Sequence, residues 1–126
     1  MEVAEECILV IEDNELNMKL VRALLKMGNY HVLEAANAEI GIQLTRKHRP
    51  DLVLIDIQLP GMDGLSATRI IKEDSEIKDI PVVAITSYAM QGDEQKAIDA
   101  GCTGYMTKPI DTRSFLETIS LFLGHD

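Results

Sequence analysis

The sequence lacks any long apolar run. Its longest apolar stretches are short, strand-like segments such as 8–11, whereas crossing a bilayer takes roughly 20 apolar residues. The stretch 1–6 carries three glutamates and no basic residue, so it does not have the character of a signal peptide. We therefore expect a cytoplasmic protein that does not enter a membrane.

Cysteine and histidine are too few and too scattered to suggest a disulfide framework or a zinc site. Cys7 and Cys102 form no C-x-x-C pair and have the character of small buried hydrophobes. The three histidines, at positions 31, 48 and 125, lack the spacing of zinc ligands. Neither residue type predicts a function here.

Basic residues are outnumbered, with 12 Lys and Arg against 21 Asp and Glu, and the net charge is −9. Such a surface repels phosphodiester backbones, so we expect no direct binding to DNA or RNA. Over most of the surface the acidity simply favours solubility. Because 46% of the 126 residues are hydrophobic, the chain can bury the core of one domain.

Short apolar runs alternate with amphipathic segments along the whole chain. The expected strands are 7–12, 30–34, 51–56, 81–86 and 104–107, and the expected helices are 14–28, 37–50, 65–72, 91–100 and 111–124. Asn14 is expected to cap the first helix and Asp111 the last. The apolar positions of the first helix recur at helical spacing; they are Leu16, Leu20, Leu24 and Met27.

Strands that alternate with helices predict an α/β fold with a parallel sheet covered on both faces. Right-handed crossovers leave few topologies. We expect a doubly wound, flavodoxin-like sheet of five strands in the order 2-1-3-4-5, with five helices. The whole chain, 1–126, is expected to be one domain with its core at about 7–123.

Polar groups follow the apolar runs at the carboxyl ends of four expected strands, where sites lie in open α/β sheets. They are Glu12 and Asp13, then Asp56, then Thr86 and Ser87, and finally Lys108 with Pro109. Three carboxylates and one ammonium at one edge carry a local charge of −2, which needs a cation. Oxygen ligands favour a hard divalent ion such as Mg²⁺. The alternative is that these acids are helix caps and solvated loop residues.

Five short motifs in this order resemble the receiver domain of two-component response regulators. They are Glu12-Asp13-Asn14, Asp56 after Leu-Val-Leu-Ile, Leu59-Pro60-Gly61-Met62-Asp63-Gly64, Thr86-Ser87 and Lys108-Pro109. The resemblance runs from about residue 7 to residue 123. The stretches 15–18 and 89–93 are similar to single-domain cell-cycle regulators and to receivers of hybrid kinases. The family fold is the one expected above.

The resemblance implies that Asp56 accepts a phosphoryl group. Glu12 and Asp13 would help hold Mg²⁺, with Asp13 and Asp56 as direct ligands and the backbone carbonyl of Gln58 completing the set. Lys108 would contact the phosphoryl oxygens. In this family Asp is commoner than Glu at position 12, and the longer side chain could bind the ion through water.

The resemblance also implies a conformational switch. Thr86 would donate a hydrogen bond to the phosphoryl group, and the small Ser87 would leave the site open to a donor. Tyr105 is either ordinary packing or the aromatic residue that moves inward on phosphorylation. A cis peptide bond is implied at Pro109. The implied partners are a histidine kinase or histidine phosphotransfer protein, and a downstream protein that binds the fourth helix, fifth strand and last helix. Such a protein is not an enzyme beyond Mg²⁺-dependent phosphorylation and dephosphorylation of itself.

Three other functions fit the sequence less well. An aspartyl phosphohydrolase of related fold usually has a second Asp two residues after the first, where this chain has Gln58, which is no general acid or base. A flavin carrier would place its phosphate after the first strand, where Glu12 and Asp13 repel it. A receiver that only binds partners, without phosphorylation, would not need every expected site position to be filled. The cognate kinase, the downstream target, the phosphoryl lifetime, the oligomeric state and the presence of further domains stay open.

Overall fold

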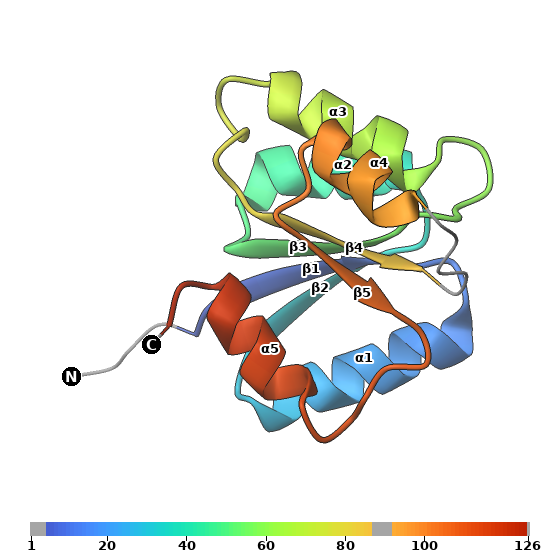
Figure 1. Cartoon of the computed structure of the whole chain (residues 1–126). Coiled ribbons are helices and arrows are strands. Elements are labelled where there is room, and N and C mark those ends of the chain that lie inside the picture. Colours follow the sequence, from blue (N-terminus) through green and yellow to red (C-terminus); the bar gives the residue numbers. More distant parts are fainter. Residues whose placement is uncertain (1–4, 87–91, 126) are drawn as a thin grey trace.

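The computed structural model describes residues 5–86 and 92–125. Five parallel strands form one sheet in the order β2-β1-β3-β4-β5, which confirms the predicted fold (Figure 1). The strands are β1 (Cys7–Ile11), β2 (His31–Ala35), β3 (Leu52–Asp56), β4 (Val82–Thr86) and β5 (Gly104–Thr107). The helices are α1 (Glu15–Met27), α2 (Ala38–His48), α3 (Gly64–Glu73), α4 (Asp93–Ala100) and α5 (Phe115–Phe122). No described helix is long and apolar enough to cross a membrane.

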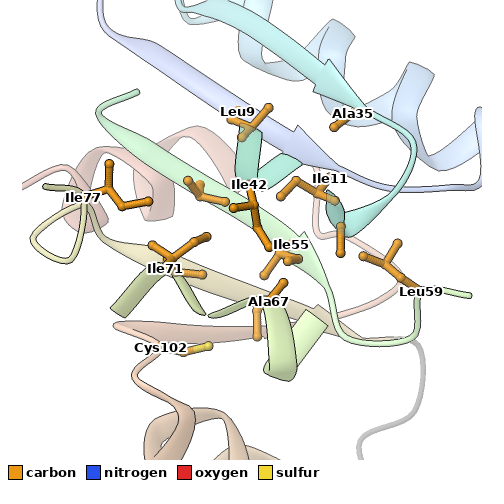
Figure 2. Close-up of a cluster of buried hydrophobic side chains, with 14 of the residues drawn as sticks. Leu9, Ile11, Ala35, Ile42, Ile55, Leu59, Ala67, Ile71, Ile77 and Cys102 are labelled. Carbon is orange, nitrogen blue, oxygen red and sulfur yellow. The ribbon is translucent and has the colours of Figure 1, made fainter. Parts of the chain in front are cut away.

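Two helical layers cover the sheet, because alternate residues of each buried strand point to opposite faces. α2, α3 and α4 lie on one face, and α1 and α5 lie on the other (Figure 1). On the first face, Leu9 and Ile55 pack with Ile42 and Ile71, as Figure 2 shows. On the second face, the core includes Leu25 of α1 and, from α5, Phe115 and Ile119; all three side chains are buried.

The apolar repeat used to predict α1 lies mostly away from the core. Leu16 is 78% exposed and Met27 73% exposed, whereas Leu24 is buried. The core face is instead formed by Met18, Val21, Leu24 and Leu25. The helix thus has a second apolar face that the fold leaves uncovered.

Two further local predictions need correction. α5 begins at Phe115 with Ser114 as its N-cap, because the Asp111 carboxylate accepts the N–H of Arg113 within a turn that precedes the helix. Cys102 is buried, as expected, but Cys7 is only half-buried.

Candidate functional site

The parallel register brings the predicted site residues to one edge of the sheet. Ile11 pairs with Ile55 across β1 and β3, so Glu12 and Asp56 follow at the same level. Asp56 pairs with Ile85, and Thr86 pairs with Thr107 on β5. Lys108 follows directly, and its N–H donates to the Thr86 carbonyl at 2.7 Å.

Lys108 joins two buried carboxylates. Its Nζ donates to Glu12 Oε1 at 2.6 Å and to Asp56 Oδ2 at 3.1 Å. Both acids are 6% exposed as whole residues, and the lysine side chain is 12% exposed. The predicted phosphoacceptor therefore lies beside the predicted phosphoryl contact, in a position sheltered from water.

Backbone groups fix the other oxygens of both acids. The N–H of Gln58 donates to Asp56 Oδ1 at 2.8 Å, and the N–H of Asn14 donates to Glu12 Oε2 at 3.2 Å. Asn14 also caps α1, since its side chain accepts the N–H of Asn17. The start of α3 is pressed against the site: a Cβ on Gly64 would overlap the carbonyl oxygen of Asp56. A glycine is needed there for that close approach.

The electrostatics leave the site short of positive charge. Burial lowers the pKa of the Lys108 ammonium, but its contacts with Glu12 and Asp56 outweigh burial and the net shift is upward, so the lysine is charged. Burial has the largest effect on Glu12 and raises its pKa, although the hydrogen bonds from Lys108 and Asn14 act the other way. Burial of Glu12 thus outweighs its hydrogen bonds, and one ammonium is shared between two buried carboxylates.

Three carboxylates converge to form a candidate cation-binding site. One oxygen from each of Glu12, Asp13 and Asp56 lies within 4.8 Å of the others, with Asp13 exposed to solvent. A cluster of oxygen donors with a solvent-facing side suits Mg²⁺, which keeps several waters. The residues present thus fit the ion that the sequence predicts.

A cavity of about 110 Å³ opens beside these groups. Asp56, Lys108 and Glu12 line its polar side, and the rest of its wall is mostly apolar. From α1 the wall includes Asn17 and Leu20, and from the segment after β5 it includes Ile110. Sequence reasoning did not place these three at the site. Asn17 lies in a stretch that carried a family likeness, which was the available signal.

The structure describes two of the three residues that the resemblance links to a conformational switch. Thr86 is 1% exposed. The Tyr105 hydroxyl is buried, and it has no hydrogen-bond partner among the described residues. Ser87 lies outside the described residues. The Lys108–Pro109 peptide bond is cis, the isomer that the resemblance implies.

Comparison with known families shows what kind of module this is. The model of the response regulator receiver domain matches residues 8–120. The chain belongs to this family. Receiver domains are the phosphorelay modules of two-component systems; they are not classical enzymes, and they work with histidine kinases or phosphotransfer proteins and with downstream partners. The alternative functions are not favoured.

Individual relatives are similar over nearly the whole chain. The polar-differentiation response regulator DivK of Brucella anthropi is 46% identical over 117 residues, which cover 93% of this chain and 95% of that protein. DivK of Brucella melitensis is 44% identical with the same coverage.

Solved structures of a receiver domain and of a response regulator have the same fold as this chain. The receiver domain of the sensor histidine kinase PA1611 from Pseudomonas aeruginosa is 31% identical, with a TM-score of 0.88. The match covers 96% of this chain and 99% of that one. That structure holds a magnesium ion coordinated in its active-site cleft. A putative response regulator from Chloroflexus aurantiacus, at 22% identity, has a TM-score of 0.92 over 97% of this chain and 100% of that chain, which shows the shared fold.

Proposed function

We propose that Asp56 accepts a phosphoryl group from a phosphohistidine protein or a small acyl phosphate. The observation that carries this is the contact between Asp56 Oδ2 and Lys108 Nζ at the buried, carboxyl-terminal edge of the sheet. One oxygen of Asp56 attacks phosphorus, a P–O bond to Asp56 forms, and the bond to the donor nitrogen or acyl oxygen breaks. Lys108 would balance the charge of the phosphoryl oxygens, and its contact with Asp56 supports this role.

We also propose that Mg²⁺ is held by Asp13, Asp56 and the Gln58 carbonyl, with Glu12 assisting. When bound, the ion would offset the repulsion between the incoming phosphoryl oxygens and the carboxylates. The support is the convergence of the three acids and the magnesium in the PA1611 receiver.

Intact mass tests both statements. The protein is incubated with acetyl phosphate, with and without Mg²⁺, and we expect a single phosphoryl adduct only with Mg²⁺. Asp56→Asn should abolish the adduct, while Asp79→Asn, the same change at an exposed acid, should keep it. An adduct that persists in Asp56→Asn would identify another acceptor. An adduct that forms equally without Mg²⁺ would contradict the proposed role of the metal.

We infer that phosphorylation remodels the face built from α4, β5 and α5, where a downstream partner binds. α4 is weakly anchored: only Ala97 and Ala100 are buried, and no side chain caps its start. Few buried contacts give a low free energy of local opening. A hydrogen bond from Thr86 to a phosphoryl group is worth about 1.5–3 kcal/mol, the size of a typical allosteric coupling of about 1–3 kcal/mol.

We propose that Tyr105 moves in this switch; its buried hydroxyl has no hydrogen-bond partner among the described residues, which supports the proposal. Its movement toward Thr86 would alter the surface that a partner meets. Hydrogen exchange with and without beryllofluoride, a phosphoryl mimic, tests the switch. We expect altered protection across 87–106; changes confined to the neighbourhood of Asp56 would contradict it. The cytoplasmic location and the absence of nucleic-acid binding stay predictions.

A further inference from the structure

The cavity beside Asp56 joins a charged group to a hydrophobic space. It measures about 110 Å³ and is bounded by α1, by the ends of β1, β3 and β4, and by the segment that follows β5 (Figure 1). Its charged lining residues are Glu12, Asp56 and Lys108, and Asn17 is also polar. Every other described residue that lines it is aliphatic. The phosphorylation chemistry proposed above uses the charged residues and gives the aliphatic wall no role.

The size and the wall of the cavity restrict what it can hold. No aromatic ring is among the described residues that line it, so a planar ligand finds no stacking partner there. An aliphatic cavity of about 150 Å³ admits benzene, and this one is smaller. A straight aliphatic chain of a few carbons fits it better than a ring. Such a chain can enter from solvent, because Leu20 in the wall is 40% exposed.

The charges indicate what the other end of such a molecule carries. Lys108 Nζ lies 3.1 Å from Asp56 Oδ2, so an anionic phosphoryl group beside Asp56 would meet the ammonium. A small acyl phosphate has both parts next to each other, because its phosphoryl group is bonded to a short acyl group. After transfer the acyl group leaves as a carboxylate, which the Glu12 carboxylate repels. The cavity would therefore release this product readily.

We propose that the cavity binds the acyl chain of small acyl phosphates and makes propionyl and butyryl phosphate better donors than acetyl phosphate. The inference rests on the proposed role of Asp56 and adds the class of donor. One oxygen of Asp56 attacks phosphorus and forms a P–O bond, the bond between phosphorus and the acyl oxygen breaks, and the carboxylate leaves with the electron pair. Leu20 and Ile110, which line the cavity, determine the preference for chain length.

Rates of phosphorylation measured with a series of donors test the proposal. The full chain is incubated with Mg²⁺ and low concentrations of acetyl, propionyl or butyryl phosphate, and intact mass follows the adduct. The three donors release similar carboxylates, and their hydrolysis without protein is measured as the reference for intrinsic reactivity. We expect the rate to rise about fourfold for each added methylene, since burying one CH₂ group contributes about 0.8 kcal/mol. Hexanoyl phosphate should be slower than butyryl phosphate, because its chain exceeds the cavity.

Two changes in the wall should remove the preference. Leu20→Gln and Ile110→Thr each place a polar group in the cavity, and each should lower the ratio of the butyryl rate to the acetyl rate at least fourfold. The ratio is taken within one variant, so a general loss of activity cancels. Leu16→Gln is the matched control: it is the same change one turn earlier on α1, at a residue that is 78% exposed and does not line the cavity. It should keep the wild-type ratio, and circular dichroism checks that every variant is folded.

The outcomes separate this inference from the proposed function. Equal rates with the three donors, with every adduct lost in Asp56→Asn, would overturn the inference alone, and the cavity would then be a packing gap. A preference for longer chains that Leu20→Gln and Ile110→Thr leave unchanged, or that Leu16→Gln also removes, would overturn it as well. No adduct from any donor in the wild-type protein would overturn both the inference and the proposed role of Asp56 as an acceptor from acyl phosphates.

Discussion

Lys108 lies closer to Glu12 than to Asp56, with Nζ–O distances of 2.6 and 3.1 Å. Glu12 therefore makes the shorter of the two ion pairs with Lys108, and Asp56 makes the second one with the same ammonium. This arrangement holds the ammonium beside Asp56, the proposed phosphoacceptor, while both acids stay buried.

Lys108→Ala should leave two neighbouring buried carboxylates without a counter-charge. We expect the free energy of unfolding to fall by about 3–5 kcal/mol without metal, since removing one partner of a buried ion pair leaves the other uncompensated. Mg²⁺ should recover much of that loss and should bind more tightly than to wild type, because a competing positive charge is gone. Urea unfolding and calorimetric titration measure the two effects.

Lys47→Ala, at an exposed position on α2, serves as the control and should change neither quantity. If Lys108→Ala bound Mg²⁺ more weakly than wild type, the lysine would have to support the ion site in some other way.

Tyr105→Phe should keep or raise stability. The buried Tyr105 hydroxyl has no partner among the described residues, and a buried unpaired polar group costs about 1–3 kcal/mol. We expect a gain of about 1 kcal/mol in urea unfolding of the unphosphorylated protein. Tyr30→Phe is the comparison, since the Tyr30 hydroxyl is not among the buried unpaired atoms of the described residues. A clear loss of stability in Tyr105→Phe would show that the hydroxyl is satisfied.

Two leucines of α1 should behave oppositely. Leu25 is fully buried, so Leu25→Ala should cost about 3 kcal/mol of unfolding free energy. Leu16→Ala should change it by less than about 0.5 kcal/mol, because that side chain is 78% exposed. Similar losses in the two variants would mean that the face assigned to the core is wrong.

The same helix shows where sequence reasoning stops. Its ends were predicted well, because the Asn14 side chain caps its start and Asn29, just after Gly28, takes the left-handed conformation that ends helices. Its core face was not, since Leu16 and Met27 share the helical spacing of core residues and only the packed sheet distinguishes the two faces. Asp111 misled in a similar way: a capping residue type also serves turns, and here it binds Arg113 N–H.

The site was more predictable than that face. The carboxyl ends of parallel strands lie at the same edge of the sheet, so the strand pattern predicted that Glu12, Asp56 and Lys108 would lie together. The strand pattern did not predict that Lys108 donates hydrogen bonds to both Glu12 and Asp56, because these contacts depend on side-chain lengths and rotamers. The cavity beside them also needed three-dimensional packing, since its wall joins α1 to the segment after β5.

Asp74 should add stability that depends on pH. Its pKa is lowered by the N–H of Glu76 and then by Arg46, which contacts it at 2.9 Å. A carboxyl whose pKa is lower in the folded state than in the unfolded state stabilises the fold at any pH above its unfolded-state pKa. This stabilisation is lost as the pH falls through the folded-state pKa. Asp74→Asn should therefore be less stable than wild type at pH 7. The difference should shrink below the usual value of 3.8, as thermal unfolding across that range would show; a constant difference would exclude the charge as its cause.

The most direct test of the account is to map the phosphorylated carboxylate chemically. The protein is treated with acetyl phosphate and Mg²⁺, then with borohydride, which reduces an aspartyl phosphate to homoserine, and its peptides are sequenced by mass spectrometry. If Asp56 is the acceptor, we expect homoserine at position 56 alone, and none without acetyl phosphate. Homoserine at Asp13 or at any other acid, with position 56 unchanged, would contradict it.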